Sequence, residues 1–230
     1  MLKLLIVIPA YNEAENIGQV IRELEETVPE YDYVVINDGS ADRTAEICRE
    51  KSFPLLDLPV NLGLTGAFQT GMRYACETGY DAAIQIDADG QHDPRYIPEM
   101  VRVMEEKGAD LVIGSRFKTE KKPRTARMAG NTLIELCVKL TTGRRLTDPT
   151  SGMRLYGRKV LPRMAYGVNY RPEPDTVAHL IRSGNKVEEV QVTMRERTAG
   201  DSYLTLGKSA RYMLQMCMDI LFIQWVRKKE

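Results

Sequence analysis

Two carboxylates stand one residue apart at the end of a short apolar run. The run ends at Ile86, and Asp87 and Asp89 follow it in the sequence Asp-Ala-Asp-Gly-Gln-His. Alternate side chains of an extended backbone point to the same side, so the two carboxylates would converge where a strand meets a loop. Carboxylate oxygens select magnesium or manganese, and such an ion stabilises negative charge on a departing group. The pair is a candidate metal cradle.

Two other polar segments follow apolar runs in the same way. Pro9, Tyr11 and Glu13 come after the run at residues 3 to 8, and Asp38 comes after the run at residues 33 to 36. A carboxylate accepts hydrogen bonds only, so Asp38 can take the imide or amide hydrogen of a pyrimidine or guanine base. A turn aspartate at Asp38 and a capping residue at Glu13 are the structural alternatives.

The elements that would position these residues alternate along the chain. Strands are predicted at residues 3 to 8, 33 to 36, 83 to 86 and 110 to 113, each followed by a loop and a helical pattern. Such alternation predicts an α/β fold with a mostly parallel central sheet flanked by helices. Helix starts are predicted at Asn12, with Glu15 completing a capping box, at Ser40 and at Asp93-Pro94.

The second half continues with weaker signals. Residues 118 to 127 are rich in Lys, Arg, Thr and Pro and have no apolar period, which predicts a mobile basic loop. Helices are expected at 131 to 140 and 173 to 182, extended segments at 154 to 156 and 186 to 193. From residue 205 onward a C-terminal amphipathic helix is predicted, with its apolar face made by Leu206, Ala210, Met213, Leu214, Cys217, Ile220, Leu221 and Trp225. It would lie in a membrane interface or serve as a core or oligomer helix.

Composition limits the function classes. A chain of 230 residues suits one large domain, and 32 basic residues balance 32 acidic ones, so nucleic acid is not an expected partner. The four cysteines have no zinc-site spacing and are expected to be reduced cytosolic thiols, with no signal peptide before them. No apolar run reaches the roughly 18 residues that a membrane span needs.

Taken together, the segments around Tyr11, Asp38 and Asp87 resemble, in order and spacing, the nucleotide-sugar half of family 2 glycosyltransferases. The resemblance implies a GT-A type domain over residues 1–204, with a nucleotide-sugar half at 1–116 and an acceptor half at 117–204, followed by the helix at 205–230. It further implies an inverting sugar transfer from a UDP- or GDP-sugar, with an oxocarbenium-like transition state. Pro9, Tyr11, Glu13 and Asp38 would contact the nucleoside, although Asn37 stands where many relatives have another Asp.

The run Asp87-Ala-Asp-Gly-Gln-His92 resembles the Asp-x-Asp-x-Gln-His arrangement of synthases of dolichyl and polyprenyl phosphate sugars. The resemblance implies that Asp89 and Gln91 bind Mg²⁺ or Mn²⁺, with Asp87 shared between the metal and the sugar or ribose. His92 is left outside the metal's ligands. The same resemblance implies that Arg116 and Arg127 of this chain hold the lipid phosphate, since guanidinium groups bind phosphate oxygens bidentately.

Three later segments complete the implied site. Asp148-Pro-Thr-Ser-Gly-Met-Arg154 resembles an Asp-x-x-Ser-Gly-Phe motif, which places Ser151 near the acceptor phosphate and lets the backbone at Gly152 approach a ligand. Arg197 and Ser202 would clamp the diphosphate, with a weaker addition from Lys208. Asp175, or else Glu173, would deprotonate a hydroxyl acceptor, whereas a phosphate monoester with a second ionisation near pH 6 needs little base.

The preferred acceptor is polyprenyl phosphate, which implies a cytoplasmic enzyme held peripherally at the inner membrane face. A sugar hydroxyl of a glycan or glycolipid is the alternative, and a catalytically silent nucleotide-sugar-binding scaffold is a third hypothesis. The glycines at 63, 66 and 71 lack the dinucleotide-binding spacing, and Gly207-Lys-Ser209 lacks the first glycine of a phosphate loop. The sugar, the nucleotide and a homo-oligomeric state are not determined by the sequence.

Overall fold

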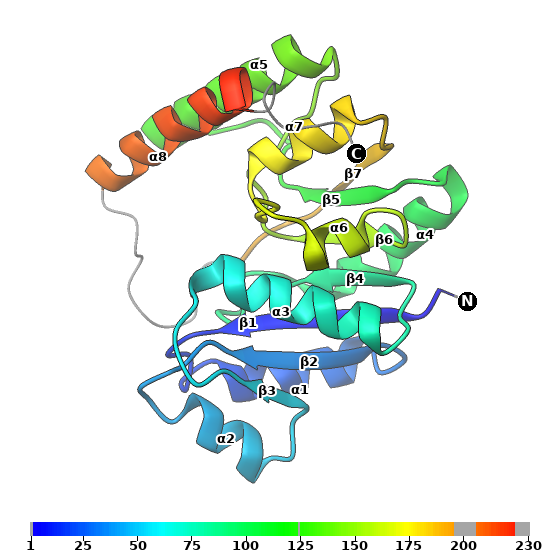
Figure 1. Cartoon of the computed structure of the whole chain (residues 1–230), viewed down its shortest axis with the longest axis vertical. Coiled ribbons are helices and arrows are strands. Elements are labelled where there is room, and N and C mark those ends of the chain that lie inside the picture. Colours follow the sequence, from blue (N-terminus) through cyan, green and yellow to red (C-terminus); the bar gives the residue numbers. More distant parts are fainter. Residues whose placement is uncertain (1, 124, 196–205, 224–230) are drawn as a thin grey trace.

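A seven-stranded sheet forms the centre of the computed structural model, which describes residues 2–123, 125–195 and 206–223 (Figure 1). The strand order is β3-β2-β1-β4-β6-β5-β7, and every neighbouring pair is parallel except the two pairs made by β6. The strands are β1 (Leu4–Ala10), β2 (Asp32–Asn37), β3 (Leu55–Asp57), β4 (Ala82–Gln85), β5 (Leu111–Ser115), β6 (Arg154–Gly157) and β7 (Val187–Gln191).

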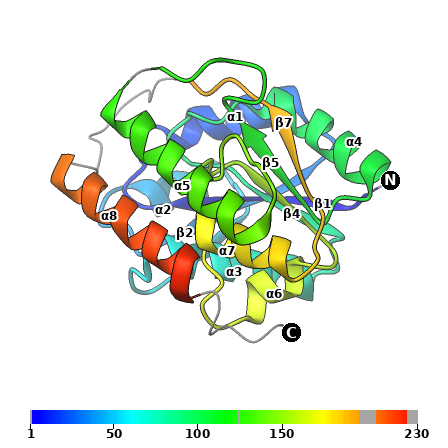
Figure 2. The same cartoon turned by 90° about the horizontal axis from the view of Figure 1, so that it is seen from above.

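Helices cover both faces of this sheet (Figure 2). One face carries α1 (Ile17–Thr27), α2 (Thr44–Glu50) and α4 (Ile97–Lys107), the last preceded by the 3₁₀ turn η1 (Pro94–Tyr96). The other face carries α3 (Gly63–Glu77), α5 (Ala126–Thr142), α6 (Leu161–Tyr166), α7 (Pro174–Arg182), α8 (Leu206–Met218) and the π-helical turn η2 (Asp219–Ile223).

The period of two along β1 divides the core between these layers. Leu5 and Val7 pack into the cluster under α3, while Leu4, Ile6 and Ile8 pack into the cluster under α1 and α4. Both faces of the central strands are therefore buried, as expected for parallel strands that read as continuous apolar runs. The predicted α/β fold with a mostly parallel sheet is confirmed, and all four strands predicted in the first half are present.

The antiparallel β6 matters for the site. Because it runs against β4 and β5, its first residue Arg154 pairs with Gln85 and Ile113 near the carboxyl ends of those strands. The segment that leads into β6 therefore enters at the same edge of the sheet where β1, β2, β4 and β5 end. A single edge gathers polar residues from both halves of the chain.

Two predicted helix starts are wrong. Helix α1 begins at Ile17, and Asn12 instead adopts a left-handed backbone with φ of 55° while its side-chain oxygen accepts a hydrogen bond from the Ala41 amide at 2.9 Å. Ser40 begins no helix; it accepts from the Asn12 amide and donates to Asn37. Both residues thus tie the loops after β1 and β2 together, a contact that local sequence cannot reveal. The start at Asp93 is confirmed, since its carboxylate accepts from the Arg95 amide at 3.0 Å.

The C-terminal helix packs into the core on one side, and whether its other side meets a membrane stays a prediction. Met216, Cys217 and Ile220 are buried in the core beside α5, which confirms a packed face. Leu214, by contrast, lies on the exposed side, together with Met218 and Phe222. Trp225 lies outside the described residues. None of the helices that the structure describes combines the length and apolar character that a bilayer span needs.

Candidate active site

The loops after β1 and β2 bring the expected nucleoside-binding residues together. The Asp38 amide donates to the Ala10 carbonyl at 2.9 Å, and its nearly buried carboxylate accepts from the Leu62 amide at 2.7 Å. Pro9 pairs with Ile36 at the end of β1, and Tyr11 follows as an exposed ring. Asp38 is thereby held rigidly at the edge of the sheet, next to the loop that carries Tyr11.

The contacts of Asn37 explain why an asparagine fits at this position, where many relatives have an aspartate. Its amide nitrogen donates to Asp57 Oδ1 at 2.6 Å, while its oxygen accepts from Ser40 at 2.5 Å. A carboxylate at this position would face Asp57 with like charge and without a donor. Glu13 lies in the loop between β1 and α1. Its carboxylate accepts a hydrogen bond from the Asn16 side chain at 2.7 Å and so stabilises the turn before α1.

The two aspartates that follow β4 lie in different environments. Asp87 is partly exposed, and its Oδ1 accepts from Gln85 Nε2 at 3.2 Å. Asp89 is 8% exposed, and its Oδ1 accepts from the Gln91 amide at 3.1 Å. The side-chain nitrogen of Gln91 donates to the Arg195 carbonyl at 3.4 Å, which leaves the side-chain oxygen as the atom that could bind a cation.

His92 and Gly152 support Asp87. The buried His92 accepts from the Asp87 amide through Nδ1 at 2.9 Å, which places the ring proton on Nε2, 3.6 Å from Asp87 Oδ2. A side chain at Gly152 would lie 3.3 Å from the His92 ring and 3.4 Å from Asp87 Oδ2. A Cβ at the motif glycine would therefore require the buried His92 ring to shift by a few tenths of an ångström, and His92 itself supports the backbone at Asp87.

The residues present fit a divalent cation that is shared with a substrate. Within the described part of the chain, no group of three or more His, Cys, Asp or Glu side chains could hold an ion alone. Mg²⁺, however, commonly binds through one or two carboxylates and completes its shell with substrate phosphates and water. Asp87, Asp89 and the Gln91 oxygen supply such a partial set of hard oxygen ligands.

Arg195, which shortly precedes the expected diphosphate-binding residues Arg197 and Ser202, is bound to the loop that carries Gln91. The Arg195 amide donates to the Gln91 carbonyl at 3.0 Å, and its guanidinium pairs with Glu23 on α1 at 2.6 Å and with Asp93 at 2.9 Å. Arg197 and Ser202 lie outside the described residues, so their diphosphate contacts stay predictions. The side chains of Arg127 and Lys208 are likewise outside the described part.

Arg116 is held by Asp148, the first residue of the Asp-x-x-Ser-Gly motif, a pairing that the sequence did not predict. Its Nε and Nη2 donate to the two oxygens of Asp148 at 2.7 and 2.8 Å, and Asp148 is fully buried. Burial alone would raise the pKa of Asp148, but the hydrogen bonds and charge of Arg116 outweigh it and lower that pKa. The Asp148 motif therefore fixes Arg116 at the end of β5. The Ser151 side chain is buried, and its contact with an acceptor phosphate stays a prediction.

A cavity of about 360 Å³ joins these features. Its lining combines polar side chains with apolar ones: Gln85, Asp87, Arg116, Asn131, Thr150, Glu173 and Tyr212 are polar, and Leu64, Met128, Ile134, Pro172 and Met213 are apolar. The apolar residues come mainly from α5 and α8, which pack against each other. The cavity thus combines charged residues from the strand edge with apolar residues from two helices that pack against each other.

The structure separates the two candidate bases. Glu173 lines the cavity and accepts a hydrogen bond from the Tyr212 hydroxyl of α8. Asp175 lies in the first turn of α7, 2% exposed, with Arg171 Nη2 at 3.7 Å from its Oδ2. Burial raises the pKa of Glu173, while the Tyr212 hydrogen bond and the Arg154 charge act in the opposite direction. The geometry favours Glu173 over Asp175 as the cavity carboxylate; the role of Asp175 stays a prediction.

Comparisons with known proteins agree with this arrangement. The family description "Glycosyl transferase family 2" matches residues 5–164. An undecaprenyl-phosphate mannosyltransferase from Micrococcus luteus is 32% identical over 222 residues, which covers 90% of this chain and 89% of that protein. A UDP-N-acetylglucosamine–dolichyl-phosphate N-acetylglucosaminyltransferase from Methanococcus voltae is 30% identical over 213 residues and covers 83% and 84% of the two chains.

Among solved structures, glucosyl-3-phosphoglycerate synthase from Mycobacterium tuberculosis with Mn²⁺ and UDP-glucose has the same fold. The TM-score is 0.71 at 18% identity, covering 96% of this chain and 79% of that one. Sequence match and fold agree along most of the chain, and both include the strand edge that carries Asp38 and Asp87. The chain belongs to glycosyl transferase family 2 and is a GT-A type glycosyltransferase.

Proposed function

We propose that this enzyme transfers one sugar, with inversion, from a UDP- or GDP-sugar to polyprenyl phosphate, using Mg²⁺ or Mn²⁺, at the cytoplasmic face of a membrane. The observation that carries the proposal is a cavity lined both by the charged Asp87 and Arg116 and by apolar residues of α5 and α8. A sugar diphosphate and a cation suit the charged residues. An acceptor that carries a phosphate on a hydrocarbon chain suits both the charged and the apolar residues. The similar proteins named for polyprenyl or dolichyl phosphate support this acceptor class.

The residues divide the work between donor and acceptor. Asp38, Tyr11 and Pro9 would hold the nucleoside, with Glu13 at the edge of the same loop. Asp87, Asp89 and Gln91 would hold the cation, which supplies Lewis-acid stabilisation of the leaving diphosphate. Arg197 and Ser202 are proposed to close on that diphosphate from the segment anchored by Arg195.

On the acceptor side, Arg116 would orient the lipid phosphate, because Asp148 fixes its guanidinium at the end of β5. Arg127 and Ser151 are proposed as further phosphate contacts. A phosphate monoester is largely ionised near neutral pH, so its own oxygen attacks the anomeric carbon without a strong base. The charge that develops on the sugar ring would be that of an oxocarbenium-like transition state.

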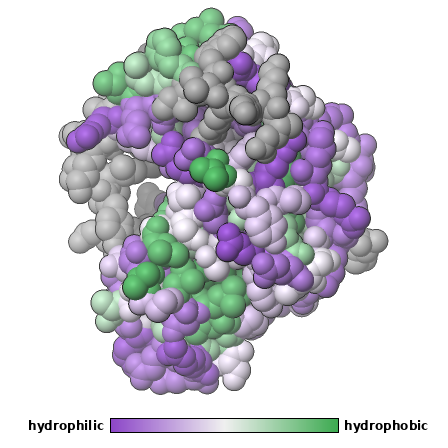
Figure 3. Space-filling view, in the orientation of Figure 1, coloured by the Kyte–Doolittle hydropathy of each residue, from purple (hydrophilic) through white to green (hydrophobic). Residues whose placement is uncertain are grey.

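The membrane contact is proposed to involve two helices. Both outer faces are apolar: α5 exposes Leu133, Leu136 and Leu140, and α8 with η2 exposes Leu214, Met218 and Phe222. Figure 3 shows apolar side chains gathered over α5. The same helices carry Met128, Ile134 and Met213 of the cavity wall, so a lipid could pass from an apolar surface into the cavity.

A panel experiment tests the function. The purified chain is incubated with UDP- and GDP-sugars, with and without Mn²⁺. The acceptor is polyprenyl phosphate, a glycan or glycolipid, or none, and both transferred and hydrolysed sugar are measured. The proposal expects transfer that requires both the cation and the lipid phosphate. Transfer only to a glycan or glycolipid hydroxyl would establish the alternative acceptor, and absence of both transfer and donor hydrolysis with every donor would favour a silent scaffold.

A further inference from the structure

The C-terminal helix contributes a side chain to the catalytic cavity. Tyr212, on α8, and Glu173, which directly precedes α7, both line it, and the Tyr212 hydroxyl donates a hydrogen bond to Glu173 Oε2. Burial and the adjacent carboxylate raise the pKa of Tyr212, so the phenol keeps its proton and acts as the donor. A residue nearly forty positions away in the chain thus fixes the orientation of the cavity carboxylate.

Other contacts hold α8 in place at this position. Arg171 Nη2 lies 3.2 Å from Asp219 Oδ2, which ties η2 to the segment just before Glu173. Met213 packs against Gly130 of α5 so closely that a Cβ at Gly130 would overlap its sulfur. The position of Tyr212 is therefore set by packing on one side and by an ion pair on the other.

The charges around Glu173 come from each element packed against it. Arg154, which is 1% exposed at the start of β6, and Arg171 favour the ionised carboxyl, and Asp175 of α7 opposes it. The Arg154 guanidinium donates from Nη2 to the Pro149 carbonyl at 2.8 Å, and its positive charge favours the ionised form of Glu173. A carboxyl released from this position would bring negative charge into a cavity that must receive a phosphate.

We propose that Tyr212 is a positioning residue that holds the Glu173 carboxyl against the cavity wall beside Arg154 and so keeps its charge away from the acceptor phosphate. The inference rests on the proposed transfer to polyprenyl phosphate. It assigns the C-terminal helix a role inside the cavity, in addition to any contact with a membrane. The effect should be larger for the acceptor than for the donor, because Asp38 and the nucleoside loops lie at the far side of Asp87 in the strand order.

A double-mutant cycle with Tyr212→Phe and Glu173→Gln tests the inference. Tyr212→Phe keeps the ring that packs in α8 and should raise the KM for polyprenyl phosphate about tenfold, the scale of one hydrogen bond to a charged group. The KM for the donor should change less than about twofold. In the Glu173→Gln background the carboxylate is absent, so adding Tyr212→Phe should change the acceptor KM less than about twofold.

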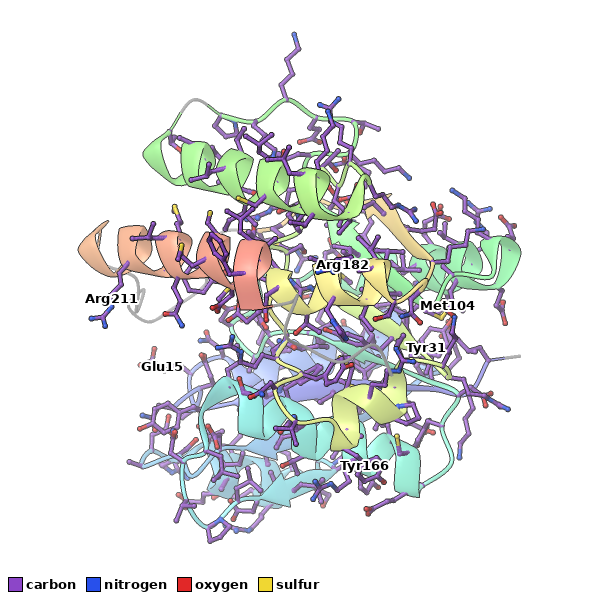
Figure 4. The ribbon with its side chains drawn as sticks, turned by 45° about the horizontal axis from the view of Figure 1, so that its top comes forward. Glu15, Tyr31, Met104, Tyr166, Arg182 and Arg211 are labelled. Carbon is purple, nitrogen blue, oxygen red and sulfur yellow. The ribbon has the colours of Figure 1, made fainter. Side chains whose placement is uncertain are left out.

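Tyr166→Phe is the matched control. Tyr166 ends α6 and is exposed, well away from α8 (Figure 4), so its replacement should leave both KM values unchanged. An unchanged acceptor KM in Tyr212→Phe would overturn the inference, as would an equal rise in donor and acceptor KM, which a merely structural role predicts. A further tenfold rise in the Glu173→Gln background would overturn it too.

The two proposals fail in different ways. If wild-type enzyme uses a sugar hydroxyl and not a lipid phosphate, the proposed acceptor is wrong, and Glu173→Gln should then lower kcat by removing a base. If wild-type enzyme uses polyprenyl phosphate but the cycle shows no coupling, only the role of Tyr212 is wrong.

Discussion

The buried pair of Arg116 and Asp148 gives the sharpest prediction about the site's scaffold. Asp148→Asn keeps the shape of the side chain but removes the charge that faces the guanidinium at 2.7 and 2.8 Å. Breaking a buried ion pair by removing one partner typically costs about 3 to 5 kcal/mol. Because the Arg116 side chain is 22% exposed and can recover some hydration, we expect the low end, about 3 kcal/mol.

Thermal unfolding measures this cost directly. For a chain of this size, about 3 kcal/mol corresponds to a fall in Tm of roughly 6 to 12 °C. The matched control is Glu99→Gln, because Glu99 also binds an arginine, Arg102, through two hydrogen bonds, at 2.8 and 2.7 Å. Those side chains are 54% and 44% exposed, so the control should lose less than about 1 kcal/mol. Equal losses in the two variants would refute the reasoning that burial makes the Asp148 pair strong.

The pH dependence of the loss provides a second check. The pKa of Asp148 is lower in the folded chain than in the unfolded one, so its stabilisation is complete above the unfolded value, near pH 4. It is lost as the pH falls through the folded value. The difference in Tm between wild type and Asp148→Asn should therefore be constant near neutral pH and shrink in acid. A difference that grows as the pH falls would contradict the assignment.

Three further predictions concern the cation, its support and the lipid surface. Asp89→Ala should lower Mn²⁺-dependent transfer more than about 100-fold, since even outer-shell partners of a metal are worth about 10- to 100-fold; undiminished turnover would defeat the metal assignment. Gly152→Ala should raise the Mn²⁺ concentration for half-maximal activity by up to about tenfold, because its Cβ would lie 3.3 Å from the His92 ring and shift the support of Asp87; an unchanged requirement would count against that support. Replacing the exposed Leu214, Met218 and Phe222 with Ser should lower the affinity for anionic liposomes, measured by co-sedimentation, at least about tenfold, and should leave core packing unchanged. An unchanged affinity would contradict the proposed membrane contact.

The first half of the fold was predictable because its strands carry their own signal. Both faces of β1 and β4 are buried, so each reads as a continuous apolar run, and polar residues mark the point where it ends. Parallel strands then bring Asp38 and Asp87 to one edge without further information. The acidic and amide residues of these loops could thus be located from order and spacing.

The remaining errors and omissions arise from contacts between distant segments. Asn12 is a residue type that often caps helices, but here its side chain joins the loop after β1 to the loop after β2, and its backbone is left-handed. Arg116 donates hydrogen bonds to Asp148, 32 residues away, and Glu173 accepts one from Tyr212, 39 residues away. No local pattern encodes such pairs, because they depend on the antiparallel β6 and on where α8 packs.

The central claim is that a cation joins Asp87, Asp89 and Gln91 to the diphosphate of the donor. Anomalous scattering from crystals soaked with Mn²⁺ and UDP or GDP measures this directly. The account predicts one manganese peak within ligand distance of both aspartates and of the diphosphate oxygens, with the base beside Asp38. A nucleotide bound with no manganese at these residues, or bound away from this edge of the sheet, would contradict it.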